Sequence, residues 1–402
     1  LFKDYGCGGL TMGEIKEIHY GIYDLQEIKQ ELQKNLILLK ARRPVLIGTN
    51  CLLKVNMNIG VSNKSEYDEE VKKLAKISAL PFRPDSMMDH TIVSLKKPLW
   101  KSMVETFDGA VGTLPHYLVF DEDMGIDECD FFDNLLDMVK GGVSFMTLHP
   151  TADLEMYNRA IISNRLIPTT SRGGYVLLKD QAINKRKENI VAKNFDKILR
   201  IFKEYNVAVS IGTVFRPATI WEDMDSFHIE ETKRQKKYID LAKQNGVAVM
   251  MEGIGHIPFN MMKKYADMIR EYEAPLMPLG PIPSDEIIGF DHISNALGSL
   301  TMAQTGVVGM INSVTREEHT GKVPSFESIL EGLKTAKTVA HCFNVSRFQQ
   351  YKERTEVIGV TRANSESCVQ KGGIFSFELI DDLEKEKCSR CMRECPLKKI
   401  IV

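Results

Sequence analysis

Between residues 45 and 345 the chain alternates short apolar runs with longer stretches in which apolar residues recur at helical spacing. The short runs predict eight strands, at Leu52–Asn58, Asp85–Asp89, Gly109–Thr113, Val143–His149, Val207–Gly212, Val247–Glu252, Pro275–Gly280 and Val307–Asn312. Helical spacing lies between most of them, for example at Glu69–Ala79, Phe131–Lys140, Asn194–Tyr205, Glu230–Asn245 and Asn260–Glu273. Such alternation of strands and helices is typical of a parallel α/β sheet.

The number of these units favours a closed barrel. About eight strand–helix units in roughly 300 residues fit a (β/α)8 TIM-type barrel better than a doubly wound sheet. A dinucleotide-binding fold is weakened further because no GxGxxG sequence opens the first unit. We therefore expect an N-terminal helical extension at 1–44 and a barrel at 45–345. A C-terminal tether that carries clustered cysteines is expected at 346–402.

Composition and charge narrow the class of protein. The 402 residues are 43% hydrophobic and 26% charged, as in soluble globular proteins. The net charge of −2 gives no general attraction to nucleic acid or to an anionic membrane. No apolar run approaches the roughly 18 residues that span a bilayer, and the first residues do not resemble a signal peptide. We therefore expect a cytoplasmic protein without nucleic-acid or membrane partners.

Three cysteines near the C-terminus form the most informative motif. Cys388, Cys391 and Cys395 have the spacing CX2CX3C, whereas the other five cysteines are scattered. Three thiolates can bind three irons of a 4Fe-4S cluster and leave the fourth iron open to a substrate or cofactor. A zinc knuckle and a ferredoxin-type cluster both need a fourth ligand, and no cysteine or histidine follows Cys395. The motif favours the open-site cluster, and the zinc knuckle stays as an alternative.

The predicted strands end in residues that are suited to chemistry. In a barrel of this type the active site lies where the strands finish. The ends and the loops that follow them read NMNIG, MMDH, TLPHY, TLHPT, SRGG, GTVFRP, MEGIGH and PLGP. Asparagine, glycine and proline are ordinary turn residues, so any one of these loops has a structural explanation. Taken together, they indicate an active site.

Within this set some residues suggest ligands. His256 and His319 could share one metal ion that water or substrate completes, although a single loop histidine more often forms a hydrogen bond. The loop Ser171–Gly174 and Arg216 suit an anion, because accessible backbone amides, a hydroxyl and a guanidinium form a phosphate cradle. Glu252 could accept a hydrogen bond from a substrate amine or hydroxyl, or merely end a strand.

These stretches together resemble the phosphomethylpyrimidine synthase family (ThiC-type), a radical S-adenosylmethionine (SAM) group with its cysteine motif at the C-terminus. The matching strings are LLKVNMNIGVS, FMTLHPT, TTSRGGYV, VMMEGIGHIPFNM, APLMPLGPIPSDEIIGFDHISNALG and EEHTGKVP. The resemblance implies a homodimeric (β/α)8 barrel whose cysteine tail reaches over an active site, and the substrate 5-aminoimidazole ribotide. It also implies cleavage of SAM to a 5′-deoxyadenosyl radical, with a reductant such as flavodoxin or ferredoxin.

The resemblance also assigns roles to individual positions. It implies substrate contacts at Asn58, Met88, Tyr117, His149, Arg216 and Glu252, and a phosphate-side loop at Ser171, Arg172 and Gly173. It implies zinc or iron at His256 and His319, and ligation of the 4Fe-4S cluster by Cys388, Cys391 and Cys395. The three cysteines and Glu252 are the expected catalytic residues.

Three departures separate the chain from the common family pattern. Thr213 stands where aspartate is expected, Met277 where tyrosine is expected, and the last cysteine spacing is X3 in place of X4. We therefore expect the branch that makes 5-hydroxybenzimidazole, with formate release, for the lower ligand of anaerobically made cobalamin. The alternatives are the phosphomethylpyrimidine synthase of thiamine biosynthesis, a zinc-dependent barrel hydrolase or lyase, and a degenerate partner of a second paralog.

Overall fold

Eight parallel strands form one sheet, and each of them overlaps one of the predicted strands. A computed structural model describes residues 36–366, 368, 374–375, 391 and 395–398. Along the sheet the order is β11-β10-β9-β8-β5-β4-β3-β12. The strands are β3 (Lys54–Ile59), β4 (Ser86–Asp89), β5 (Ala110–Thr113), β8 (Phe145–Leu148), β9 (Ala208–Ile211), β10 (Val249–His256), β11 (Leu276–Ile282) and β12 (Met310–Ser313). Their near-continuous burial is that of a parallel sheet covered by helices.

The two ends of this strand order meet, so that the sheet closes into a barrel. Strands β3 and β12 pair in parallel register at Met310↔Lys54. On the other side, the Leu276 amide donates to the Val307 carbonyl (2.9 Å) and the Gly309 amide donates to the Leu276 carbonyl (3.0 Å). Leu276 and Val308 form a parallel bridge there. Strand β11 is thereby joined to the chain that enters β12, and the predicted (β/α)8 barrel is confirmed.

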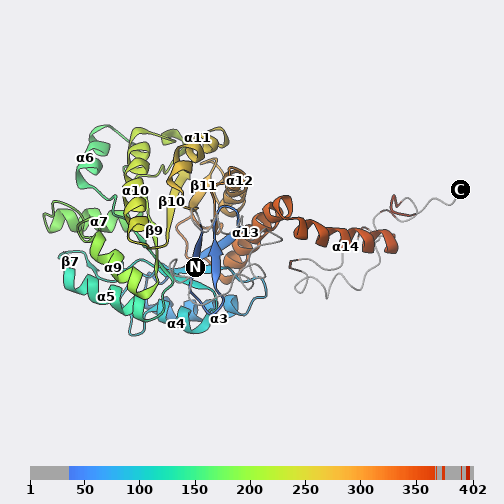
Figure 1. Cartoon of the computed structure of the whole chain (residues 1–402), viewed down its shortest axis with the longest axis horizontal. Helices are drawn as coiled ribbons and strands as arrows, with labels where there is room; N and C mark the ends of the chain where they lie inside the picture. Colours follow the sequence, from blue (N-terminus) through green and yellow to red (C-terminus); the bar gives the residue numbers. More distant parts are fainter. Residues whose placement is uncertain (1–35, 367, 369–373, 376–390, 392–394, 399–402) are drawn as a thin grey trace. The chain divides into compact units, whose positions relative to one another are not determined.

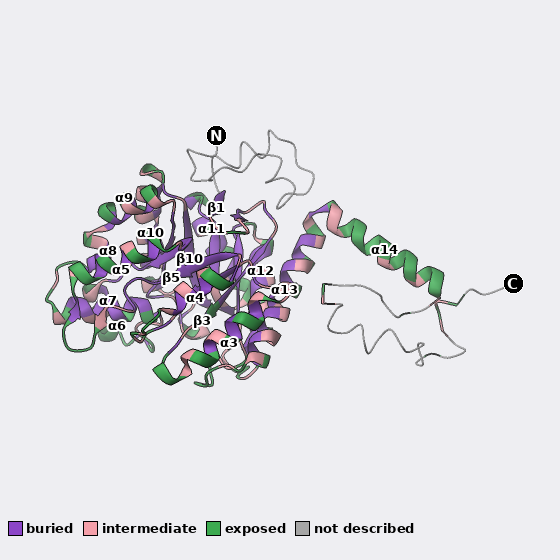
Figure 2. Ribbon diagram, turned by 90° about the horizontal axis from the view of Figure 1, so that it is seen from below, coloured by how far each residue is buried: buried purple, intermediate pink, exposed green. Residues whose placement is uncertain are grey.

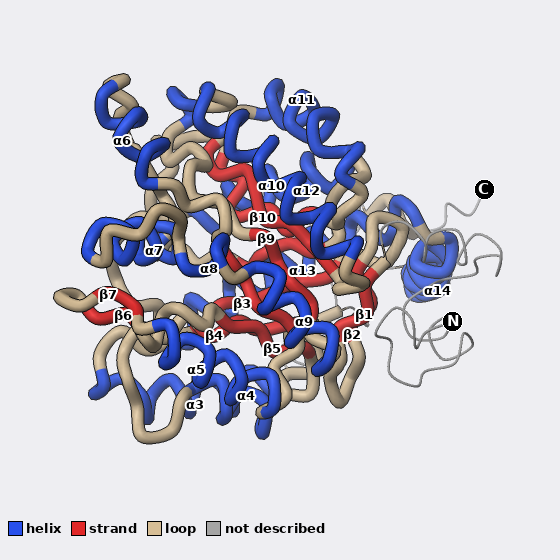
Figure 3. Tube along the Cα trace, turned by 60° about the vertical axis from the view of Figure 1, so that its left-hand side comes forward, coloured by secondary structure: helices blue, strands red, loops and turns tan. Residues whose placement is uncertain are grey.

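Helices surround the strands (Figure 3). They are α3 (Tyr67–Ser78), α4 (Leu99–Thr106), α5 (Glu128–Lys140), α6 (Leu154–Ile162), α7 (Arg172–Ile183), α8 (Ile190–Lys193), α9 (Phe195–Tyr205), α10 (Ser226–Gln244), α11 (Phe259–Ile269), α12 (Asp291–Gln304) and α13 (Phe326–Arg347). Helix α9 illustrates the pattern, since it buries Phe195, Ile198, Leu199 and Phe202 on one face. All five stretches with predicted helical spacing form helices.

A short antiparallel hairpin precedes the barrel. It consists of β1 (Ile37–Leu39) and β2 (Val45–Ile47). Its apolar side chains share one buried cluster with the first residues of several barrel strands, among them Ala110, Phe145 and Met310. The hairpin therefore packs at the amino-terminal end of the barrel, opposite the carboxyl ends of the strands. Residues 37–39 form a strand where a helical extension was predicted, because their three consecutive apolar residues are all buried.

The chain divides into two compact units between Ala340 and His341. The second unit contains α14 (Gln349–Ser365), whose residues are exposed or half-buried, as the green and pink ribbon in Figure 2 shows. Figure 1 colours the chain by position and labels most of its helices. Residues 1–35 and Cys388 lie outside the described residues. Among the described helices, none is long and apolar enough to cross a membrane.

Candidate active site

A cavity of about 580 Å³ lies at the carboxyl ends of the barrel strands. Ten of the residues predicted for the site line it: Asn58, Met88, Tyr117, His149, Ser171, Arg172, Arg216, Glu252, His256 and His319. Gly173 does not line it and lies beside the ring of His149. The cavity therefore brings together side chains from strand ends and loops that are far apart in the sequence, as a barrel predicts.

One end of the cavity is suited to an anion. Ser171 caps helix α7, and its Oγ accepts a hydrogen bond from the Gly174 amide (3.1 Å). The same Oγ lies 2.9 Å from Nε2 of His149. Arg172 and Arg216 line the cavity here. Two guanidiniums beside the positive end of a 12-residue helix favour a negatively charged ligand.

Two glycines leave room for the ring of His149. A Cβ at Gly173 would lie 2.4 Å from Cε1 of His149 and 2.9 Å from Nε2 of His116. A Cβ at Gly212 would lie 2.7 Å from Nε2 of His149. The glycine of the SRGG loop is therefore required by the packing of two imidazoles, in addition to any access that it gives to backbone amides.

A buried carboxyl group, that of Glu252 on strand β10, also lines the cavity. Glu252 is 3% exposed, and its Oε1 accepts hydrogen bonds from Thr147 Oγ1 (2.6 Å) and Ser210 Oγ (3.2 Å). Burial raises the pKa of Glu252 above that of an ordinary glutamate. The carboxyl group therefore holds a proton more readily than usual, which suits a residue that exchanges hydrogen bonds with a polar ligand.

His256 and His319 form a pair at the rim of the cavity. Their ring centroids are 5.0 Å apart. Nδ1 of His256 lies 2.6 Å from Oδ1 of Asp285, and Nδ1 of His319 lies 2.7 Å from Oδ1 of Asp291. A carboxylate on Nδ1 fixes the tautomer that leaves Nε2 free for a metal ion. Burial also lowers the pKa of His256, which keeps this ring in the neutral form that binds metals.

His256 and His319 could supply two ligands to a divalent metal ion. No group of three or more histidine, cysteine, aspartate or glutamate residues in the described part of the chain could hold a metal ion. Water or substrate would have to supply the remaining ligands, as in open metal sites. Zinc or iron at His256 and His319 therefore stays a proposal.

The cysteine tail is described in part. Cys391 and Cys395 are free cysteines, the first exposed and the second half-buried. Two accessible thiols with the spacing CX3C are compatible with a cluster ligand set, which Cys388 would complete. The three cysteines therefore suit a 4Fe-4S cluster by the chemistry of their thiols and by their spacing in the sequence.

Comparison with known proteins identifies the family. Residues 23–400 match the Radical SAM ThiC family. The chain belongs to this family. It is 28% identical to a phosphomethylpyrimidine synthase of Thermotoga petrophila over 417 residues, covering 97% of this chain and 96% of that protein. It is 32% identical to that of Saccharolobus islandicus (76% of this chain, 71% of that protein) and 29% identical to that of Pyrococcus abyssi (89% and 86%).

Thr213 and Met277, at which the family resemblance led us to expect aspartate and tyrosine, are both buried. Thr213 is 2% exposed, and its Oγ1 is buried without a hydrogen-bond partner in the described part of the chain. Met277 is 1% exposed and packs in the barrel core, in register with Glu252 on the neighbouring strand. Neither residue lines the cavity. In this ThiC-family protein their effect on a ligand would therefore pass through neighbouring residues.

Several residues that build the site were not predicted. Glu231 of α10 is 1% exposed and accepts hydrogen bonds from the amides of Val214 and Phe215 (2.6 Å each) and from Thr151 Oγ1 (2.7 Å). It thereby fixes the loop that carries Arg216. Asp285 and Asp291 hold the histidine pair. The sequence around Asp285 and Asp291 matched the family, but nothing in the sequence distinguished Glu231 from the surface charges of its helix.

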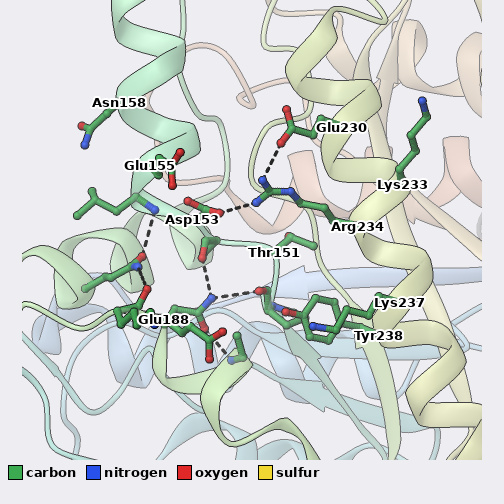
Figure 4. Close-up of a pocket in the computed structure, with 17 residues that line it drawn as sticks. Thr151, Asp153, Glu155, Asn158, Glu188, Glu230, Lys233, Arg234, Lys237 and Tyr238 are labelled. Atoms are coloured by element: carbon green, nitrogen blue, oxygen red, sulfur yellow. Dashed lines mark hydrogen bonds and ion pairs between the residues drawn. The ribbon is translucent and has the colours of Figure 1, made fainter.

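A larger cavity of about 880 Å³ lies outside the barrel, between α6, α8 and α10 (Figure 4). Several of its polar side chains are bonded to neighbouring residues. Arg234 contacts Asp153 (2.5 Å) and Glu230 (2.6 Å), and Asn189 donates to the carbonyls of Pro150 (3.1 Å) and Ala152 (2.7 Å). Figure 4 shows the Arg234 side chain held between the two carboxylates. The barrel cavity is the better candidate, because it lies at the carboxyl ends of the barrel strands, where barrels of this type have their active sites.

Proposed function

We propose that this ThiC-family protein is a phosphomethylpyrimidine synthase, which binds 5-aminoimidazole ribotide in the barrel cavity and converts it to hydroxymethylpyrimidine phosphate. The observation that carries the proposal is the convergence of ten predicted residues on one cavity. Its volume lies within the range of roughly 300–1,000 Å³ that is usual for small-molecule sites. The relatives that cover most of the chain carry this name, which supports the pyrimidine product over 5-hydroxybenzimidazole.

In this proposal each end of the cavity holds one part of the ribotide. Arg172, Ser171 and the first amides of α7 bind the phosphate, since they combine positive charge with hydrogen-bond donors. Glu252 accepts a hydrogen bond from the amino group or a ribose hydroxyl. His149, packed between Gly173 and Gly212, orients Ser171. The buried surroundings exclude water from the reacting part of the ligand.

Cofactors supply the radical chemistry, and the chain supplies their ligands. Cys388, Cys391 and Cys395 would hold the 4Fe-4S cluster, and His256 and His319 would hold a zinc or iron ion. When bound, the cluster and SAM provide the one-electron cleavage that begins the rearrangement. The proposal includes a homodimer and an external reductant such as flavodoxin or ferredoxin.

Anaerobic reconstitution tests the proposal. Protein loaded with iron and sulfide, then given 5-aminoimidazole ribotide, SAM and a reductant, should yield hydroxymethylpyrimidine phosphate and 5′-deoxyadenosine, measured by mass spectrometry. About four irons per chain are expected. Cys391→Ala is the matched inactive control. A colourless zinc protein that leaves SAM uncleaved would support the zinc-dependent hydrolase or lyase instead. Activity that appears only after a second paralog is added would support the degenerate-partner alternative.

A second candidate product is 5-hydroxybenzimidazole, and the environments of Thr213 and Met277 favour it. A threonine with an unpartnered hydroxyl and a buried methionine offer less polar support behind the cavity than the expected aspartate and tyrosine. The rearranging ligand would therefore be held differently. The same reaction mixture decides between the products, because detection of 5-hydroxybenzimidazole in place of the pyrimidine would select this candidate.

A further inference from the structure

His90 is a cavity residue to which neither the family resemblance nor the function proposed above gives a role. It directly follows strand β4 and is one of the residues that line the cavity. Its Nε2 is buried and has no hydrogen-bond partner in the described part of the chain. The other three cavity histidines each have a side-chain partner, His149 on Nε2 and His256 and His319 on Nδ1, although Nδ1 of His149 is also buried without a partner in the described part of the chain. A buried, unpaired polar atom in a binding cavity suggests that a ligand supplies the partner.

The position of His90 is fixed by backbone packing. Its amide donates to the Ile59 carbonyl (2.8 Å). Gly60 packs so closely that a Cβ there would lie 2.6 Å from the His90 carbonyl carbon. The imidazole meets the Tyr117 ring edge to face, with centroids 6.1 Å apart. The ring is therefore held in place without a bond from its Nε2.

The charges around His90 belong to the anion end of the cavity. Burial lowers the pKa of His90 to about 4, and the positive charges of Arg172 and Arg216 lower it further in the same direction. Near pH 7 the ring is neutral, with one N–H donor and one acceptor nitrogen. A neutral imidazole beside two guanidiniums can donate to the same anion without adding a third positive charge to the empty cavity.

We propose that His90 is a further substrate-binding residue, which donates a hydrogen bond to the phosphate group of the ribotide beside Arg172. It thereby contributes to selectivity for the phosphorylated ligand over the free riboside. This inference rests on the function proposed above, because it takes the ribotide as the ligand.

Other unpaired imidazoles do not qualify for this role. His116 has two unpaired ring nitrogens but is fully buried behind the cavity wall, against His149 and Tyr117. His228 is also buried and unpaired, and it stacks on Tyr265 away from the cavity. His90 differs from His116 and His228 because it lines the cavity. His228 therefore offers a control of the same chemical kind.

Calorimetric titration without SAM tests the inference on the full-length protein. The unaltered protein, His90→Leu, His90→Gln and His228→Leu are each titrated anaerobically with 5-aminoimidazole ribotide and with its riboside. His90→Leu should lose about tenfold or more in affinity for the ribotide, as expected for one hydrogen bond to a charged group, and less than about twofold for the riboside. His90→Gln, which keeps a donor, should recover most of the loss. His228→Leu should bind both ligands as the unaltered protein does.

The outcomes separate this inference from the function on which it rests. Equal ribotide affinity in His90→Leu and the unaltered protein would overturn the inference and leave the proposed function in place. Equal losses for ribotide and riboside would overturn the phosphate contact. No ribotide binding by the unaltered protein would overturn both. Thermal melts check that each variant folds, and His90→Gln carries the test if the leucine variant does not.

Discussion

The imidazole rings of His256 and His319 meet edge to face, with centroids 5.0 Å apart, although one ends strand β10 and the other follows β12. Each ring is held on Nδ1 by its own aspartate, Asp285 or Asp291. Two rings oriented by carboxylates, with Nε2 available on each, have the arrangement in which a metal ion binds with little reorganisation.

Removing one of these aspartates should weaken metal binding without removing a ligand. In Asp291→Asn the amide cannot fix the His319 tautomer as a carboxylate does, so zinc affinity should fall by about 10- to 100-fold. His319→Ala should lower it further. Both are measured by competition with a zinc chelator on protein that lacks the cluster. Asp267→Asn, a surface carboxylate paired with Lys263, is the control and should bind zinc normally. Unchanged affinity in His319→Ala would exclude the pair as a metal site.

Replacement of a tail cysteine should abolish cluster-dependent activity and leave the barrel folded. Cys391 is exposed and belongs to the second unit, so Cys391→Ala should leave the far-UV circular dichroism and melting temperature of the barrel unchanged. Iron content and SAM cleavage should both be lost. Cys129→Ala, an exposed cysteine on α5, should retain both. A collapse of the circular dichroism signal in Cys391→Ala would show that the tail is structural, contrary to this prediction.

The barrel could be predicted because its strands are short, buried and bounded by turn residues, which leaves a clear period in the sequence. Helix α7 was less visible. Two consecutive glycines are unfavourable inside a helix, so the SRGG segment suggested a turn. The structure shows a helix that begins at Arg172, with Gly173 adjoining His149 and Gly174 adjoining Val214. Glycine is required there because residues distant in the sequence pack against it, and such contacts cannot be predicted from the local sequence.

The residues that line the cavity were also more predictable than the residues that support them. Cavity residues lie at strand ends, where the barrel geometry directs attention. Glu231 accepts a hydrogen bond from the backbone of the loop that carries Arg216, and Thr147 donates one to Glu252. Such partners depend on which segments meet in space. In the sequence, Glu231 lies among the charged residues of an ordinary amphipathic helix.

A side chain at position 173 should disturb the anion end of the cavity. In Gly173→Ala the new methyl group would overlap the rings of His149 and His116, both buried. Overpacking of this kind costs about 1–3 kcal/mol in the free energy of unfolding, and ribotide affinity should fall with the displacement of Ser171. Chemical denaturation and calorimetry measure the two effects. Gly359→Ala, in exposed helix α14 with open space around it, should stabilise that helix by up to about 1 kcal/mol and leave ribotide affinity unchanged. Wild-type stability and affinity in Gly173→Ala would contradict the packing described here.

Buried neutral histidines should make the barrel sensitive to acid. Burial lowers the pKa of His228 to about 3, while an unfolded histidine titrates near its usual value of about 6.5. Between these values the unfolded chain binds a proton that the folded chain does not, so the free energy of unfolding falls as the pH is lowered. A shift of this size contributes about 2 kcal/mol of lost stability between pH 7.5 and pH 5. His228→Leu removes this contribution. Between pH 7.5 and pH 5, the free energy of unfolding in urea should therefore fall by about 2 kcal/mol less in His228→Leu than in the unaltered protein. Parallel pH profiles for the two proteins would mean that His228 is protonated in the folded state or is accessible to solvent.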